Sequence, residues 1–104
     1  MIGIIKKMLG MGPKEDLGAI IDKGAVVIDV RTPAEYAQGH MKGSVNIPLA
    51  SLQSQLAKLK KDRPVITCCA SGMRSGSAKS VLTANGFGEV YNGGSWMNLK
   101  KFEK

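Results

Sequence analysis

The two cysteines of this 104-residue chain are neighbours, Cys68 and Cys69, and they stand between an apolar run and a stretch rich in glycine and serine. A cysteine reacts as its thiolate, and the ordinary pKa of about 8.5 leaves a thiol mostly protonated at neutral pH. The first backbone N–H groups of a helix lack partners within the helix and stabilise an anion. Residues 64–75 are typical of a short buried strand, a tight loop and a helix start. They predict a reactive thiol at a strand-to-helix junction.

The residues after Cys69 have the composition of a loop that can curl around a sulfur anion. Glycine permits the backbone angles that such a curl demands, and serine hydroxyls add hydrogen-bond donors. Successive N–H groups that point inward then form an anion-binding nest. An arginine can supply a positive charge there or tie the loop to the body of the domain. The loop expected to form this nest consists of Ala70, Ser71, Gly72, Met73, Arg74 and Ser75.

Only one of the two cysteines can face this loop, because neighbouring side chains of a strand point to opposite faces. Gly72 lies three residues after Cys69, Arg74 lies five after it, and a helix follows. This arrangement favours Cys69 as the nucleophile. We expect Cys68 to pack in the core on the other face, because free cysteine is among the most buried residue types.

Strands and helices alternate along the rest of the chain. Residues 25–30 are almost wholly apolar, which is typical of a parallel strand covered on both faces. Thr32 to Glu35 form a capping box with proline at the first helical position. The patterns predict four strands, at residues 25–30, 45–47, 64–68 and 89–91. They also predict five helices: between Gly12 and Gly24, from Thr32 to near Gly39, over 51–61, through Ala78 and Leu82 to Asn85, and after a turn at Gly93–Gly94.

This alternation predicts an α/β fold with a mostly parallel sheet flanked by helices. In such open sheets the ligand site lies beyond the carboxyl ends of the strands, where Cys69 falls. The length predicts one domain, which we place at residues 13–104. Residues 1–12 carry apolar side chains at helical spacing and are expected to form an N-terminal flap or short helix.

The composition narrows the function. The formal charge of +7 comes mostly from scattered lysines, so we expect a solvated surface that steers small anions or meets an acidic protein. Only 5% of the residues are aromatic and no nucleic-acid motif occurs, so no nucleic-acid partner is expected. Adjacent cysteines close no useful disulfide loop. With one histidine they fall short of a structural zinc site, and we expect neither a metal nor a cofactor.

The cysteines also suggest a compartment. Free thiols in a working site are typical of a reducing, cytoplasmic setting. Residues 1–11 lack the pattern of a signal peptide and are too short to span a bilayer. We therefore expect a cytoplasmic protein without a membrane span.

Four segments together resemble the rhodanese family of sulfurtransferases. The stretch from Cys69 to Ser75, with Gly72 and Arg74 in place, is similar to the active-site loop of that family. Residues 28–36 and 39–48 resemble its two leading signatures, and Gly93–Gly94 followed by a tryptophan resembles its closing one. The similarity runs from about Leu17 to Leu99. It implies a rhodanese-like three-layer α/β sandwich around a five-stranded, mostly parallel sheet.

The resemblance also implies a chemistry. Cys69 matches the family's catalytic cysteine and would hold a transferable sulfur as a persulfide. Residues 70–75 match its substrate-binding loop. The donor would be a small anion such as thiosulfate, or a persulfide, and the acceptor would be a thioredoxin-like protein, a small thiol or cyanide. The other motif residues are expected to have structural roles. Asp29 and Arg31 would form an ion pair or hydrogen bonds that order the loop. Glu35 and His40 would stabilise the structure and would not act as general bases.

Two alternatives stay open. Five residues separate Cys68 from Arg74, and Ser75 follows the arginine. This is the spacing of cysteine phosphatases and arsenate reductases. Gly72 favours the shorter, sulfur-carrying loop, because it lies three residues after Cys69. In the second alternative the domain carries a persulfide between partner proteins as an interaction module. The sequence does not separate that role from turnover of a small donor.

Overall fold

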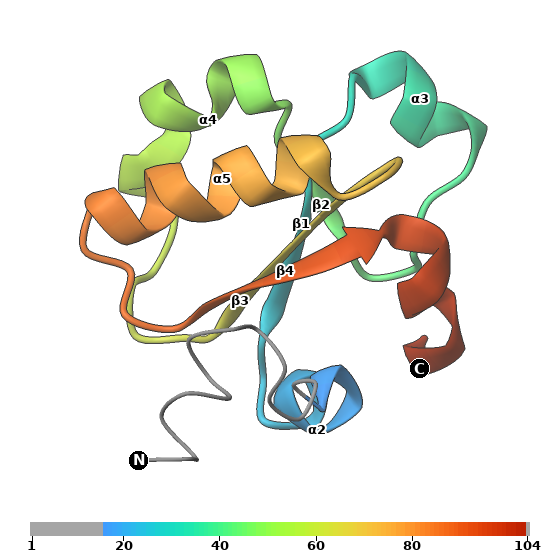
Figure 1. Cartoon of the computed structure of the whole chain (residues 1–104), viewed down its shortest axis with the longest axis horizontal. Coiled ribbons are helices and arrows are strands. Elements are labelled where there is room, and N and C mark those ends of the chain that lie inside the picture. Colours follow the sequence, from blue (N-terminus) through green and yellow to red (C-terminus); the bar gives the residue numbers. More distant parts are fainter. Residues whose placement is uncertain (1–15, 104) are drawn as a thin grey trace, which may run out of the picture.

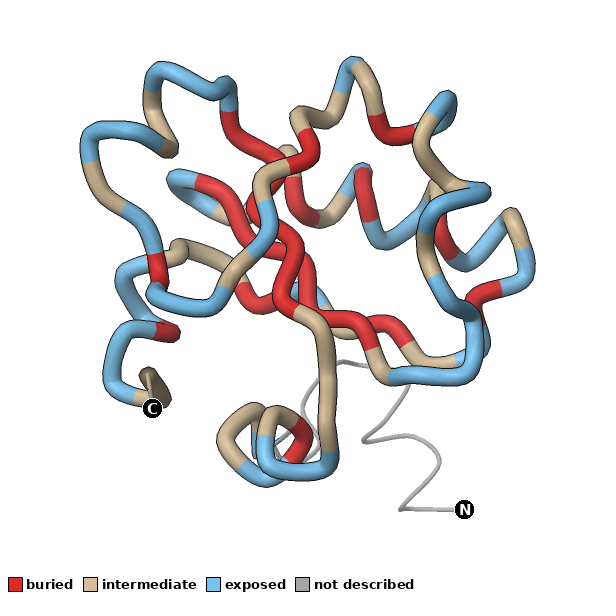
Figure 2. Tube along the Cα trace, turned by 180° about the vertical axis from the view of Figure 1, so that it is seen from behind, coloured by how far each residue is buried: buried red, intermediate tan, exposed pale blue. Residues whose placement is uncertain are grey.

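A parallel sheet forms the middle layer of the protein, seen in a computed structural model that describes residues 16–103 (Figure 1). Its strand order is β2-β1-β3-β4, and every pairing is parallel. The strands are β1 (Val26–Asp29), β2 (Val45–Asn46), β3 (Val65–Cys69) and β4 (Val90–Ser95). All five residues of β3 are buried, as Figure 2 shows for the centre of the sheet. This central strand ends on the candidate nucleophile.

Helices cover both faces of the sheet and confirm the three-layer α/β architecture (Figure 1). The helices α4 (Leu49–Gln55) and α5 (Met73–Ala84) lie on one face, and a single 3₁₀ turn, η1 (Leu56–Lys58), follows α4. On the other face lie α2 (Leu17–Asp22) and the 3₁₀ helix η2 (Trp96–Phe102). The remaining helix, α3 (Pro33–Gln38), follows β1 directly. It stands at the same end of the sheet as the start of α5.

Each face of the sheet has its own hydrophobic core. The first core, beneath α4 and α5, is formed by residues that include Ile28, Leu52, Cys69, Leu82 and Phe87. The second core, beneath α2 and η2, is formed by Ile20, Val27, Met41, Ile66, Cys68 and Leu99. Burial at roughly 25 cal/mol per Å² of apolar surface makes these cores the main source of stability. The two cysteines belong to different cores, as the alternation of a strand requires.

The helix α3 forms where the capping box predicts it. The Thr32 side chain accepts a hydrogen bond from the Glu35 backbone N–H, and the Glu35 carboxylate accepts one from the Thr32 backbone N–H. Pro33 occupies the first helical position, and Gly39 follows the helix as its C-cap. The carboxylate of Glu35 is thereby fixed at the end of the sheet where β1 and β3 stop.

Three expectations need correction. The described residues contain four strands, not five; the sequence patterns gave four, and the fifth came from the resemblance alone. The helix expected over 51–61 begins at Leu49, after Pro48 as N-cap, and ends in η1 because Leu59 is extended. The strand expected over 89–91 continues to Ser95, so Gly93–Gly94 lie within β4 and do not turn the chain. The N-terminal segment 1–12 lies outside the described residues.

An irregularity in the β3–β4 pairing explains the long last strand. Thr67 pairs with Asn92, whereas Cys69 pairs with Ser95, so β4 has one residue more than β3 between the two pairs. Such a bulge bends a strand and changes the direction of its side chains. Gly93 fits there because an added Cβ would lie 2.9 Å from the Thr67 carbonyl oxygen. The chain thus passes close to β3 at the level of the cysteines.

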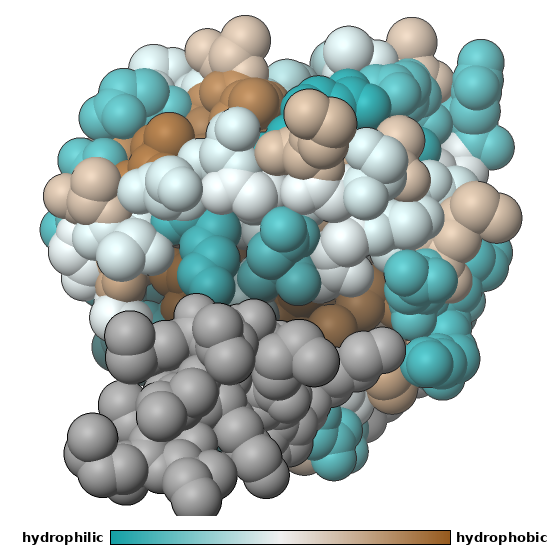
Figure 3. All heavy atoms as spheres, viewed as in Figure 1, coloured by the Kyte–Doolittle hydropathy of each residue, from teal (hydrophilic) through white to brown (hydrophobic). Residues whose placement is uncertain are grey.

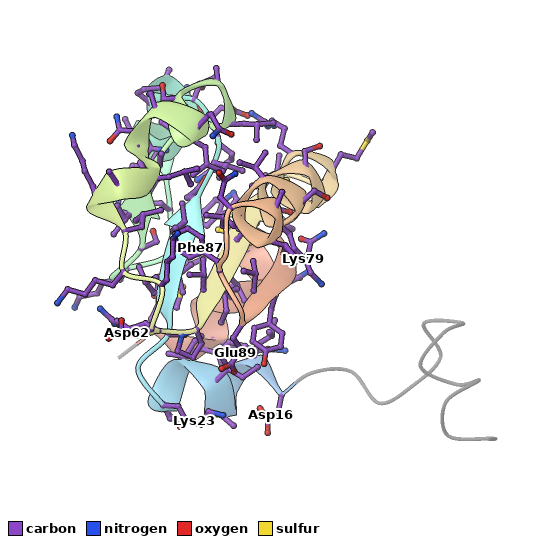
Figure 4. The ribbon with its side chains drawn as sticks, turned by 90° about the vertical axis from the view of Figure 1, so that its left-hand side faces the viewer. Asp16, Lys23, Asp62, Lys79, Phe87 and Glu89 are labelled. Carbon is purple, nitrogen blue, oxygen red and sulfur yellow. The ribbon has the colours of Figure 1, made fainter. Side chains whose placement is uncertain are left out.

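Charged side chains lie mainly at the surface. On the face drawn in Figure 3 the hydrophilic residues are spread widely and are not gathered in one patch. Figure 4 shows Asp62 and Glu89 near the end of the sheet at which β3 and β4 begin, opposite to Cys69, and Lys79 on the outside of α5. Within residues 16–103, no helix has the length and apolar character needed to cross a membrane.

Candidate functional site

Cys69 is the last residue of β3, and its sulfur lies inside the loop that leads into α5. Its Sγ accepts hydrogen bonds from the backbone N–H groups of Gly72, at 2.9 Å, and Ser75, at 3.4 Å. The side chain has 0% exposure in this structure. Two inward N–H groups around one sulfur are the nest that the loop was expected to form. A negative charge on Sγ is stabilised there.

The Ser75 hydroxyl completes the surroundings of the sulfur, with its Oγ 3.4 Å from Cys69 Sγ. Burial of the thiol raises its pKa, but hydrogen bonds from Ser75, Gly72 and Ser71 lower it by more. The pKa of Cys69 therefore lies below that of an ordinary thiol. A lower pKa increases the thiolate fraction at neutral pH, which is the condition for nucleophilic attack.

Gly72 gives the loop its shape. It is the N-cap of α5 with φ of 107°, in the left-handed region that glycine adopts without strain. This conformation turns its N–H toward the sulfur while its carbonyl accepts the Gly76 N–H in the first turn of α5. Three other loop residues are exposed: Ala70, Ser71 and Met73, the last with 82% exposure. They are the solvent-facing part of the loop that encloses the sulfur.

Arg74 ties the loop to the body of the domain. Its guanidinium forms two hydrogen bonds with the carboxylate of Glu35, at 2.7 and 3.0 Å. The Arg74 hydrogen bond and the Thr32 backbone N–H lower the pKa of Glu35 to about 2. Glu35 thus joins the cap of α3 to the first turn of α5. Arg74 thus anchors the loop through its hydrogen bonds, and its charge also interacts with Cys69.

Cys68 has the opposite surroundings. It has 0% exposure and packs with Ile66 and Leu99 on the other face of the sheet. Burial, with a further contribution from the charge of Asp29, raises the pKa of Cys68 to about 12. A thiol in this state is protonated at neutral pH and cannot attack. The geometry gives no support to phosphatase or arsenate-reductase chemistry at Cys68.

The other motif residues form structural contacts. The Asp29 carboxylate accepts hydrogen bonds from the Arg31 guanidinium, with Nε at 2.9 Å and a terminal nitrogen at 2.8 Å, and from the Arg31 backbone N–H at 3.0 Å, in a buried ion pair. The Arg31 guanidinium also lies 4.7 Å from the centre of the Trp96 ring. His40 stacks on Tyr36 at 3.7 Å, and its Nδ1 lies 2.7 Å from the Tyr36 carbonyl oxygen. The ion pair foreseen for Asp29 and Arg31 is present.

A hollow of about 330 Å³ lies beside the Arg74 side of the loop. Its lining is mainly apolar and comes from the segment after β1, the start of α4 and the start of α5. The lining residues are Val30, Thr32, Pro48, Leu49, Ala50 and Arg74. This hollow is a place where a molecule could lie beside the loop.

Sequence reasoning did not single out Asn92 in β4. Its side chain hydrogen-bonds the Ser75 hydroxyl, the Gly72 carbonyl oxygen and the Gly94 N–H. An asparagine before two glycines is a signal of a special backbone position. Its partners at the start of α5 lie 17 and 20 residues earlier in the chain, however, and only the fold brings them together.

Comparisons with known proteins show which family the chain belongs to. The family model described as Rhodanese-like domain matches residues 13–100. The thiosulfate sulfurtransferase GlpE of Stutzerimonas stutzeri is 39% identical over 80 residues, which are 77% of this chain and 73% of that protein. The uncharacterized protein YqhL of Bacillus subtilis is 43% identical over 68 residues, 65% of this chain, and the match spans only 54% of YqhL.

A solved structure described as rhodanese with anions from E. coli superposes with a TM-score of 0.68 at 35% identity, over 72% of this chain and 91% of that one. The chain therefore belongs to the rhodanese-like domain family, which confirms the resemblance found in the sequence. Within that family it is a rhodanese-type sulfurtransferase.

Proposed function

We propose that this sulfurtransferase moves a sulfane sulfur from a small anionic donor to a thiophilic acceptor through a persulfide on Cys69. The observation that carries the proposal is the convergence of two backbone N–H groups and the Ser75 hydroxyl on the Cys69 sulfur. The name of the relative GlpE, a thiosulfate sulfurtransferase, supports thiosulfate as the donor.

In the first half of the reaction the Cys69 thiolate attacks the outer sulfur of thiosulfate. A new S–S bond forms to Sγ, the S–S bond of thiosulfate breaks, and sulfite leaves with the bonding electron pair. The product is a cysteine persulfide anion. The N–H groups that stabilise the thiolate also stabilise this anion and the charge that develops during transfer. The lowered pKa of Cys69 increases the fraction of thiolate, so the proposed step uses no general base.

In the second half a nucleophile attacks the terminal sulfur of the persulfide. The bond between the two sulfurs breaks, and Cys69 leaves as the thiolate that the nest stabilises. Cyanide would leave as thiocyanate, and a thiolate of a small molecule or a thioredoxin-like protein would leave as a persulfide. This double displacement is nucleophilic catalysis with ping-pong kinetics.

Both half-reactions require that a second molecule reaches the Cys69 sulfur. Cys69 has 0% exposure, so the donor and the acceptor reach it only when the loop makes room. Ala70, Ser71 and Met73 are the exposed part of the loop and are the residues expected to yield. Two free cysteines, one of which must stay reduced to act, fit a cytoplasmic location.

The test is intact-mass spectrometry after incubation with thiosulfate, in the absence of reductant. The wild-type chain is expected to gain one sulfur atom, Cys69→Ala none, and Cys68→Ala one. Added cyanide should remove the sulfur and release thiocyanate. Thermal unfolding of each variant verifies that it is folded.

Two results would overturn the Cys69 carrier: a wild-type chain that gains no sulfur from thiosulfate or from a persulfide donor, or a gain that is lost in Cys68→Ala and kept in Cys69→Ala. A gain with a persulfide donor but none with thiosulfate would keep the Cys69 carrier and replace the donor. That outcome would favour the role in which the domain carries a persulfide between proteins.

A further inference from the structure

Asn92 holds the two residues whose backbone N–H groups contact the Cys69 sulfur. Its Nδ2 donates to the Gly72 carbonyl oxygen at 3.1 Å, and its Oδ1 accepts from the Ser75 hydroxyl at 2.6 Å. Gly72 and Ser75 are the donors at 2.9 and 3.4 Å from Sγ. One side chain on β4 therefore fixes both ends of the nest.

The orientation of the Asn92 amide is itself fixed. The Gly94 N–H donates to Asn92 Oδ1 at 2.9 Å, which leaves Nδ2 to face the Gly72 carbonyl. The bulge in β4 makes this possible, because it places Gly94 where its N–H can reach back to Asn92. The hydrogen bond between Gly94 and Asn92 thus holds the Asn92 side chain in one orientation beside the first turn of α5.

The Ser75 hydroxyl has one proton and two acceptors within reach, Asn92 Oδ1 at 2.6 Å and Cys69 Sγ at 3.4 Å. While Cys69 is a thiol, its S–H points to Ser75 Oγ and the hydroxyl proton points to Asn92. When the sulfur is an anion, the hydroxyl proton can turn to it. Asn92 Oδ1 then keeps the Gly94 N–H as a hydrogen-bond partner.

We propose that Asn92 is a positioning residue of the sulfur-transfer site: it holds Gly72 and Ser75 against Cys69 and accepts the Ser75 proton only while the sulfur is neutral. This inference rests on the proposed function for its purpose. The effect of Asn92 on the ionisation of Cys69 does not depend on which sulfur donor is used.

Few other ionisable groups act on the sulfur. Arg74 on α5 interacts with Cys69 through its charge, although its hydrogen bonds go to Glu35 on α3. Cys68, on the same strand, stays a neutral thiol because its pKa is raised to about 12. A change at Asn92 therefore reaches Cys69 through the hydrogen bonds of the nest, while these groups stay as they are.

The test compares Asn92→Asp with the wild type. A carboxylate keeps both acceptor roles, holds the Ser75 proton more strongly, and loses the donor to the Gly72 carbonyl. The rate of Cys69 alkylation by iodoacetamide is followed against pH, with peptide mapping to identify the cysteine. The midpoint is expected to rise by about one pKa unit, which is an approximately tenfold slower reaction at a pH below both midpoints. Asn92→Ala should shift it in the same direction by less.

Asn98→Asp is the matched control, because it makes the same change of charge on an exposed residue of η2 for which the structure shows no side-chain hydrogen bond among residues 16–103. Thermal unfolding reports any loss of stability. If Asn92 had only a structural role, its substitution would lower the stability but leave the pH midpoint of Cys69 alkylation unchanged. Unchanged midpoints in both Asn92 variants, or an equal shift in Asn98→Asp, would refute the inference. Alkylation uses no sulfur donor, so this outcome is distinct from failure of the sulfur-gain experiment.

Discussion

At the scale of single residues, hydrogen bonds stabilise the Cys69 anion more directly than any cation does. The arginine of the loop forms its hydrogen bonds with Glu35 and affects the sulfur only through its charge. The direct contacts to Sγ come from the N–H groups of Gly72 and Ser75 and from the Ser75 hydroxyl. Hydrogen bonds to a charged group contribute about 1.5–3 kcal/mol each, enough to set the ionisation of a thiol.

This surrounding predicts the effect of Ser75→Ala. The hydroxyl is the first of the hydrogen bonds that lower the pKa of Cys69, and its loss should raise that pKa. The thiolate is the form of Cys69 present above its pKa, so the reactivity of Cys69 falls as the pH drops through that pKa. In Ser75→Ala the reactivity should begin to fall at a higher pH. One pKa unit corresponds to about tenfold slower alkylation and sulfur uptake at a pH below both midpoints.

Ser77→Ala is the control for this prediction. Ser77 is exposed on the same helix, and the structure shows no hydrogen bond of its hydroxyl within residues 16–103. Its pH profile should coincide with that of the wild type. A Ser75→Ala profile that also coincides would show that the backbone N–H groups suffice to set the pKa of Cys69.

At the scale of elements, the site depends on contacts between segments far apart in the chain. Glu35 in α3 and Arg74 in α5 are 39 residues apart and join the two helices at one end of the sheet. Asn92 in β4 holds the start of α5 from the other side. The loop around Cys69 is therefore fixed by three elements, and α5 alone would not give it this shape.

Much of this arrangement could be predicted from local patterns. The capping box from Thr32 to Glu35 and the apolar run of β1 encode their own structure, and the spacing of Gly72 to Cys69 indicated the nest. The roles of Asn92 and the partner of Arg74 could not be predicted, because they depend on contacts across 17 to 39 residues. The extent of β4 was missed because consecutive glycines usually end a strand, whereas here they form a bulge.

The close approach at Gly93 gives a prediction for this element. An added methyl group would lie 2.8 Å from Ile66 Cγ2 and 2.9 Å from the Thr67 carbonyl oxygen, in a place where the backbone must move. Gly93→Ala should lower the free energy of unfolding by about 1–3 kcal/mol, the usual effect of overpacking a core. Denaturant unfolding measures it.

Gly88→Ala separates this steric effect from the general effect of replacing a glycine. A Cβ at Gly88 would meet nothing within 4 Å, and neither glycine has a positive φ. Gly88→Ala should change the stability by less than about 0.5 kcal/mol. Equal stability of the two variants would mean that β4 can move away from β3 without cost.

At the scale of the whole molecule, the sheet separates two cores with different roles. The core beneath α4 and α5 contains Cys69 and packs against the helix whose start forms the nest. The core beneath α2 and η2 contains Cys68 and Leu99 and has no residue of the loop. The active sulfur and the bulk of the second core thus lie on opposite sides of one buried strand, β3.

This division predicts that stability and reactivity can be changed separately. Leu99 has 0% exposure, so Leu99→Ala should cost about 2–5 kcal/mol, a large share of the roughly 5–15 kcal/mol that stabilises a domain. At a temperature where the variant is folded, the pH midpoint of Cys69 alkylation should equal that of the wild type. Met97→Ala, on the same helix at 65% exposure, should change neither quantity. A shift of the Cys69 midpoint in Leu99→Ala as large as that in Ser75→Ala would contradict the separation and show that β3 transmits the loss of packing to the nest.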